Sequence, residues 1–230
     1  MSEKSERVFI SGATGVLGRR VLPALTSAGY EVGGLSRSDQ NGAWVEGTSP
    51  IDPSPGGVFQ SAVDLENKVA QAESRGLPTC VLRFGMFYAA EAAQTKSMLQ
   101  ALARGFFPII GEGDTCWNMI HADDAAKAVL CAIERKDEAI GKPLDIADDE
   151  PVQVKVLLRD LAHRMDGPNP RFIPLWLARW LLGSHVVDYL MSSVRCRNQP
   201  AKDTLDWRPA HATYREGFDT ILERDSVGAN

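Results

Sequence analysis

The stretch Val8-Phe-Ile-Ser-Gly-Ala-Thr-Gly-Val-Leu-Gly18 decides the fold of this chain. Its beginning, Arg7 to Ser11, is a β-branched and aromatic run that predicts a buried strand. A glycine-rich turn follows, and apolar residues then recur at helical spacing until Ala28-Gly29. A second strand is predicted over Tyr30 to Ser36, so the segment forms one β-α-β unit of about thirty residues.

The glycine-rich turn carries the clearest chemistry in the sequence. Gly12 permits the tight turn, Gly15 lets the backbone approach phosphates, and Gly18 lets helix and strand pack closely. A turn of this kind exposes backbone N–H groups at a helix N-terminus, where they hold a pyrophosphate. We therefore predict that a dinucleotide contacts the whole run, Gly12, Ala13, Thr14, Gly15, Val16, Leu17 and Gly18. The alternative is a structural loop with no ligand.

The end of the second strand indicates which dinucleotide binds. An acidic residue there would bind a ribose 2′-hydroxyl and favour NAD. This chain has Ser36-Arg37-Ser38, and a guanidinium flanked by hydroxyls suits a 2′-phosphate. We therefore predict NADP with Arg37 at its adenosine end. Asp39 lies two residues later, so NAD stays open as the alternative.

These motifs resemble those of a known family. Val8 to Gly18 looks like the opening of the extended and atypical short-chain dehydrogenase/reductases, the NAD-dependent epimerase/dehydratase group. Further similarities follow in the family's order, at Leu82 to Tyr88, Pro108 to Asp114, Ile120 to Ala126 and Leu205 to Pro209. The stretch Leu82 to Tyr88 resembles the family's Arg-Pro-Gly-x-x-Tyr, and Leu205 to Pro209 resembles its Leu-Gly-Trp-x-Pro. The resemblance therefore extends over nearly the whole chain.

The resemblance implies an α/β fold, a reduced Rossmann-like parallel sheet with a small, mostly helical C-terminal lobe. Residues 1–150 would form the dinucleotide-binding domain, and residues 151–230 a substrate lobe interwoven with it. The reaction that the family implies is hydride transfer at a carbonyl or alcohol of a small molecule, as an oxidoreductase or epimerase/dehydratase. Phe172 to Met191, in the place of the family's mobile lobe, would pack against substrate or a subunit rather than a membrane.

One departure from the family is an apparent internal deletion. After the second strand, Ser38 to Gly57 is mostly turn chemistry, and Asn41 to Pro50 looks like the loop after the family's fifth strand. The family's third to fifth strands are then missing. Strand 1 must pair directly with the sixth strand, Thr79 to Phe84, or a partner chain must fill the gap, or the gap stays open. We therefore expect an unpaired strand edge, a homo-oligomer, and a mobile loop over Ser38 to Gly57.

A second departure concerns catalysis, because the family uses a Tyr with a Lys four residues later. No tyrosine here has that lysine, and alignment by Glu66 places Val58 and Ala62 at the two positions. The catalytic residues are therefore unknown, and Tyr88 is the one hydroxyl that we nominate, with packing as an equal alternative. Hydride transfer is expected to be impaired. A non-catalytic dinucleotide-binding regulator and an inactive, internally deleted product are the alternatives.

Composition excludes several other classes. The net charge is −5 and no basic run occurs, which argues against nucleic-acid binding. The four cysteines show no metal-ligand or redox spacing, and the polar N-terminus favours the reducing cytoplasm. No apolar stretch approaches the ~18 residues of a membrane span. His121 with Asp123 and Asp124 could form a metal site, but aspartates at such a position more often cap the following helix. We therefore predict no metal, and we predict that Asp123 or Asp124 caps the helix.

Overall fold

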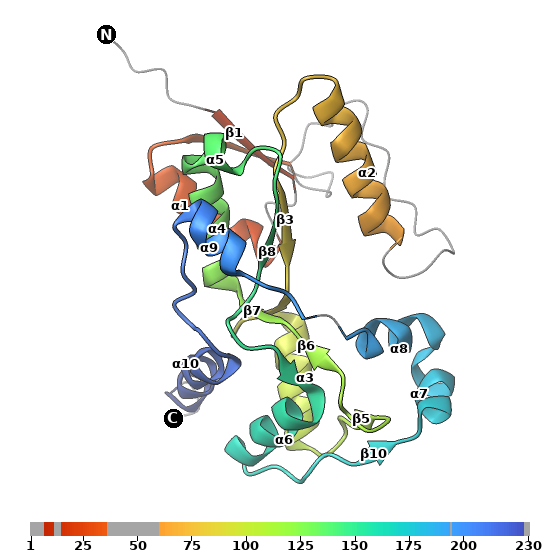
Figure 1. Ribbon diagram of the computed structural model, residues 1–230. Coiled ribbons are helices and arrows are strands. Elements are labelled where there is room, and N and C mark those ends of the chain that lie inside the picture. Colours follow the sequence, from red (N-terminus) through yellow and green to blue (C-terminus); the bar gives the residue numbers. More distant parts are fainter. Residues whose placement is uncertain (1–6, 12–14, 36–59, 194, 228–230) are drawn as a thin grey trace.

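A computed structural model describes residues 7–11, 15–35, 60–193 and 195–227 (Figure 1). Parallel strands and helices alternate along the chain, so the predicted α/β class is confirmed. The segment Ser38 to Gly57, predicted to be a mobile loop, lies outside the described residues.

The N-terminal β-α-β unit forms as the sequence predicted. Strand β1 (Arg7–Ser11) pairs in parallel with β2 (Glu31–Leu35), and α1 (Gly18–Ser27) connects them. The apolar stripe of α1 places Val21 and Leu25 in a small core with Ala126 of α4 (Ala122–Glu134). The helical spacing of apolar residues in the sequence therefore indicates the buried face of this helix.

A second group of parallel strands carries the rest of the fold. Strand β3 (Val81–Phe84) pairs with β8 (Pro143–Ile146), and β4 (Met86–Tyr88) pairs with β7 (Met119–His121). The short strands are β5 (Ile109–Ile110), β6 (Cys116–Trp117), β9 (Val152–Gln153) and β10 (Phe172–Ile173). Strand β6 runs antiparallel to β9, whereas β10 runs parallel to β5.

Helices flank these strands on both sides. The remaining helices are α2 (Gln60–Ser74), α3 (Ala93–Ala103), α5 (Lys136–Ala139), α6 (Val154–Arg164), α7 (Leu175–Leu182), α8 (Ser184–Met191), α9 (Gln199–Leu205) and α10 (Tyr214–Val227). Helices α4, α5 and α9 lie on one side of β3 and β8, and α2 lies on the other (Figure 1). None of the helices within the described ranges is long and apolar enough to cross a bilayer.

The C-terminal segment packs back onto the first part of the chain. The fully buried Trp207 donates its indole N–H to the carbonyl oxygen of Asp124, at 3.1 Å. It shares a core with Ile120, Leu144 and Leu205. The interwoven arrangement and the domain boundary near residue 150 stay predictions.

The sheet is interrupted where strands were predicted to be missing. Among the described strands, β1 pairs with β2 and β3 pairs with β8, and no ladder joins β1 to β3. The N–H groups of Val81 and Gly85 donate toward β8. Because bonding alternates along a parallel strand, the backbone groups of Leu82 and Phe84 point to the opposite edge. The described residues therefore do not pair β1 directly with β3, the strands that correspond to the first and sixth strands of the family.

Candidate functional site

The N-terminus of α1 is the part of the predicted dinucleotide site that the structure describes. Its N-cap residue, Leu17, makes no side-chain capping bond, and its first turn contains no acidic residue. The N–H groups of Arg19 and Arg20 already donate to the carbonyl oxygens of Gly15 and Leu17. The positive end of the helix dipole still makes this end chemically suited to a phosphate. Gly12, Ala13, Thr14 and Arg37, which complete the predicted site, lie outside the described residues.

Arg20 fixes the position of this helix end. Its guanidinium pairs with Glu91 and Asp123 and donates to the carbonyl oxygen of Val16 at 3.1 Å. The hydrogen bond from Arg20 lowers the pKa of Glu91, so that carboxylate stays charged. Arg20 therefore ties the glycine-rich turn to the start of α4 and to the loop before α3.

Tyr88 lies in the protein interior rather than in a cleft. Its side chain is 1% exposed, its hydroxyl donates to Asp148 Oδ2 at 2.9 Å, and its ring stacks on Phe218 with centroids 4.8 Å apart. Burial is the main cause that raises the pKa of Tyr88 far above its ordinary value, and Asp148 raises it further. This geometry favours the packing alternative over a catalytic role.

Asp148 is a buried carboxyl group with an unusual charge state. It is 5% exposed, and its Oδ1 has no hydrogen-bond partner among the described residues. Burial raises the pKa of Asp148 to about 8, against the lowering effect of the Tyr88 hydrogen bond. The group is therefore largely protonated at neutral pH. Its position just after β8 carried no signal in the sequence.

His121 caps α4, so the prediction that Asp123 or Asp124 caps this helix is wrong. The Nδ1 atom of His121 accepts the backbone N–H of Asp123 at 3.3 Å, and both aspartates lie inside the first helical turn. Burial lowers the pKa of His121, which keeps the ring neutral and able to accept. The aspartates instead place negative charge at the helix N-terminus, where it is stabilising.

Asp124 ties the C-terminal segment to α4. Its carboxylate accepts the backbone N–H groups of Ala210, at 2.7 Å, and His211, at 3.0 Å. His211 Nδ1 lies 2.8 Å from the same carboxylate. The ligand atoms of His121, Asp124 and His211 lie within 4.8 Å of one another, close enough for a metal ion. Because the Asp124 oxygens already accept hydrogen bonds from these donors, the arrangement fits a structural role. His211 stands alone in the sequence, so no spacing pattern predicted its contact with Asp124.

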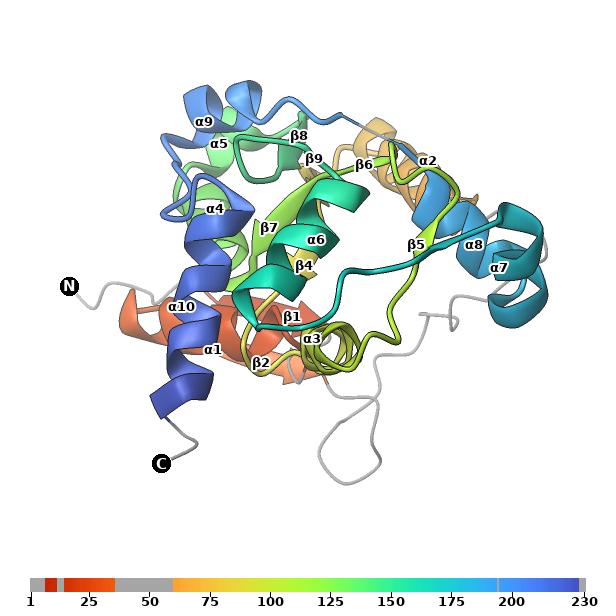
Figure 2. The same cartoon turned by 90° about the horizontal axis from the view of Figure 1, so that it is seen from below.

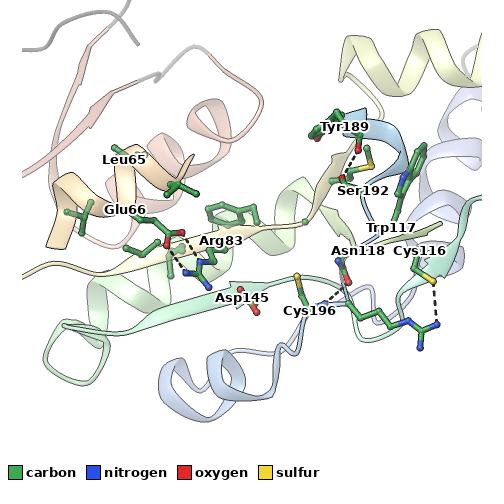
Figure 3. A pocket seen from close by; sticks show the side chains of 18 of the residues that line it. Leu65, Glu66, Arg83, Cys116, Trp117, Asn118, Asp145, Tyr189, Ser192 and Cys196 are labelled. Carbon is green, nitrogen blue, oxygen red and sulfur yellow. Dashed lines mark hydrogen bonds and ion pairs between the residues drawn. The ribbon is translucent and has the colours of Figure 1, made fainter. Parts of the chain in front are cut away.

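A pocket of about 820 Å³ lies beside β3, between α2, β6 and the end of α8 (Figure 3). Arg83 on β3 bonds Glu66 on α2 through two N–H groups, at 2.8 and 2.6 Å. Arg195 lines the pocket and donates to Cys116 Sγ at 3.6 Å. The pocket therefore combines apolar walls with polar groups along the unpaired side of β3.

Comparisons with known proteins agree with this architecture. The chain is 32% identical over 170 residues to a 3-diazoavenalumate denitrifying reductase from a Streptomyces species, an alignment that covers 73% of this chain and 54% of that protein. The chain thus spans about half the length of this curated relative. It is also 21% identical over 291 residues to the uncharacterized protein C2A9.02 of Schizosaccharomyces pombe, covering 90% of this chain and 96% of that protein. No family model matches.

The solved structure of human epimerase family protein SDR39U1 (isoform 2) with NADPH superposes with a TM-score of 0.72 at 16% identity, over 94% of this chain and 99% of that chain. The chain therefore has the fold of the epimerase and short-chain dehydrogenase proteins, in agreement with the resemblance seen in its sequence. The 291-residue alignment is longer than this 230-residue chain, so it includes positions at which this chain has no residue. That result supports the predicted internal deletion.

Proposed function

We propose that this chain binds NADP as an epimerase/dehydratase-type member of the short-chain dehydrogenases, and that its ancestral hydride transfer is impaired. The observation that carries the proposal is the uncapped N-terminus of α1, which follows β1 and a glycine-rich turn and has no acidic residue in its first turn. The dinucleotide would lie along Gly12 to Gly18 with Arg37 at its 2′-phosphate. When bound, it would supply a hydride.

The residues present fit a dinucleotide at the adenosine end better than at the reactive end. The human structural neighbour was solved with NADPH and a Thermus thermophilus epimerase with NAD, so the neighbours support a nicotinamide dinucleotide, and Arg37 is the residue that favours NADP. The Tyr/Lys pair of the family is absent from the sequence, and Tyr88 is buried against Asp148. A chain of this kind binds a cofactor without the groups that complete proton transfer.

A small organic molecule is the proposed substrate, in keeping with the reductase in the relative's name. The second candidate function is a non-catalytic dinucleotide-binding regulator in the cytoplasm. The burial of Tyr88 favours this candidate, because it removes the one hydroxyl nominated for catalysis.

Isothermal titration with NADPH and NADH tests the cofactor assignment. We expect the unmodified protein to bind NADPH more tightly than NADH. Gly15→Trp should abolish binding, because a bulky side chain blocks the approach of the backbone to the phosphates. Arg37→Ala should weaken NADPH binding roughly ten- to a hundredfold, the loss of one charge-assisted hydrogen-bond set, and NADH binding much less.

The matched control is Arg104→Ala, an exposed arginine at the C-terminal end of α3. It should leave both affinities unchanged. Tighter binding of NADH than of NADPH by the unmodified protein would show that the assignment of Arg37 is wrong.

A further inference from the structure

Helices α7 and α8 form a projecting hairpin with an uncovered apolar surface. Ala178 and Val187 are buried within it, whereas Trp176 is 70% and Trp180 80% exposed. Further exposed apolar side chains on the same two helices are Leu181, Leu182 and Val186. Large aromatic groups this exposed are rare on a monomer surface and mark an interaction site. We call this surface the tryptophan hairpin.

A concave apolar surface lies next to it. The pocket beside β3 has α2 as one wall, where Val63 is 50% and Leu65 54% exposed. Its floor is β3, whose outer edge no described strand covers. The tryptophan hairpin is therefore a convex apolar surface, and this pocket is a concave one on the same chain.

The two surfaces are neighbours on one side of the molecule. Tyr189 of α8 lines the pocket, so the hairpin continues into the pocket wall. Figures 1 and 2 both place α2 and α8 on the same side of the strands. A convex and a concave patch side by side are self-complementary about a twofold axis, because each chain can insert its projection into the other's recess.

The charges on these surfaces are already paired within the chain. Arg179 and Asp188 form an ion pair at 2.9 Å on the hairpin, and Arg83 pairs with Glu66 in the pocket. Binding to an anionic membrane would need a cluster of unpaired lysines and arginines, which α7 and α8 lack. An apolar protein surface is therefore the better match than a lipid surface.

We propose that a second copy of this chain docks here, with the tryptophan hairpin of each protomer seated in the other's pocket beside β3. Two tryptophans this exposed bury on the order of 300 Å² per protomer. The hairpin leucines and the apolar walls of the two recesses add to this area, and stable complexes bury roughly 1,200–2,000 Å² in total. The interface fills the space that the missing strands leave open.

Sedimentation velocity and light scattering on the cofactor-free full chain test this proposal. We expect the unmodified protein to have the mass of a dimer. Trp180→Glu on the hairpin and Leu65→Glu in the pocket should each give a monomer with unchanged circular dichroism, because both side chains are already exposed in the protomer. Phe106→Glu is the control: Phe106 is 79% exposed but lies on neither surface, so this variant should stay dimeric.

Mixing the two monomeric variants separates this arrangement from other dimers. A mixed pair keeps one intact half of the interface, the hairpin of the Leu65→Glu chain in the pocket of the Trp180→Glu chain. We therefore expect the mixture to associate more strongly than either variant alone. A monomeric unmodified protein, a dimer that survives both substitutions, or a mixture no stronger than its components would each overturn the proposal. So would tight binding to phosphatidylcholine vesicles that Trp180→Glu abolishes while the protein stays monomeric.

Because no cofactor is present in these measurements, their result is independent of NADP binding. A dimer without affinity for NADP would contradict only the proposed function. A monomer that binds NADPH would contradict only the docking arrangement.

Discussion

Oxidation of NADPH in the presence of aldehydes, ketones or nucleotide sugars is expected to be absent, or about 10²–10⁴-fold slower than with a positioned proton donor. Carbonyl reduction develops negative charge on the substrate oxygen, and an acid must protonate it. Val58 and Ala62, at the positions of the family's Tyr and Lys, bear no proton donor, and neither side chain is among those described. No described strand takes the place of the family strands that would hold the reacting groups, and lost proximity costs several kcal/mol more.

A spectrophotometric assay over a panel of such carbonyl compounds measures this rate. Tyr88→Phe is the informative variant, since Tyr88 is the one hydroxyl nominated as a substitute donor. We expect Tyr88→Phe to leave any trace activity unchanged, because its hydroxyl is buried against Asp148. Robust turnover by the unmodified protein would contradict the proposal that hydride transfer is impaired. Loss of that turnover in Tyr88→Phe would identify Tyr88 as a catalytic group.

The dependence of stability on pH should flatten when Asp148 is replaced by asparagine. The pKa of Asp148 is raised from 3.8 to about 8 in the folded protein. Between these values the unfolded chain has lost the proton while the folded protein keeps it, so folding becomes less favourable as the pH rises. Below pH 3.8 the penalty is absent, and above about pH 8 it is complete. Its size is on the order of a few kcal/mol.

Chemical denaturation at a series of pH values measures this slope. Asp148→Asn should remove most of the fall in unfolding free energy between about pH 4 and pH 8, because an amide does not ionise. At acid pH the variant should be somewhat less stable, since the amide nitrogen gains no acceptor. Asp137→Asn, an exposed aspartate on α5, is the control and should keep the original slope. An unchanged slope in Asp148→Asn would show that Asp148 ionises normally.

Several elements could be predicted because their signals are local. The β-branched run before the glycines and the helical spacing after them gave β1 and α1, with Val21 and Leu25 on the buried face. The sequence of α6 has an apolar stripe too, and its members Leu157, Leu158 and Leu161 are all fully buried. In each case the spacing of apolar residues over about a dozen positions indicates which face of the helix is buried.

The prediction for the N-cap of α4 was wrong because two aspartates next to each other resemble a capping signal. Asp123 and Asp124 are common capping residues, and the sequence offers them side by side. The helix starts earlier than that pattern suggests, at Ala122, so the His121 ring becomes the acceptor and Asp124 turns into the interior. There it binds the backbone of Ala210 and His211, residues that no spacing rule connects to it.

The sequence by itself determined the fold class and the absence of the Tyr/Lys pair, and it predicted a phosphate site at the glycine-rich turn, because these depend on residue types at short, fixed spacings. Only the tertiary structure decided that Tyr88 is buried, that burial raises the pKa of Asp148, and that a hairpin with two exposed tryptophans lies beside an apolar pocket. Burial and electrostatics at these places come from groups far apart in the chain: Tyr88 meets Asp148 and Phe218, and Tyr189 meets the pocket wall of β3. A solvent-excluded environment is the sum of such long-range contacts, and no window of sequence contains it.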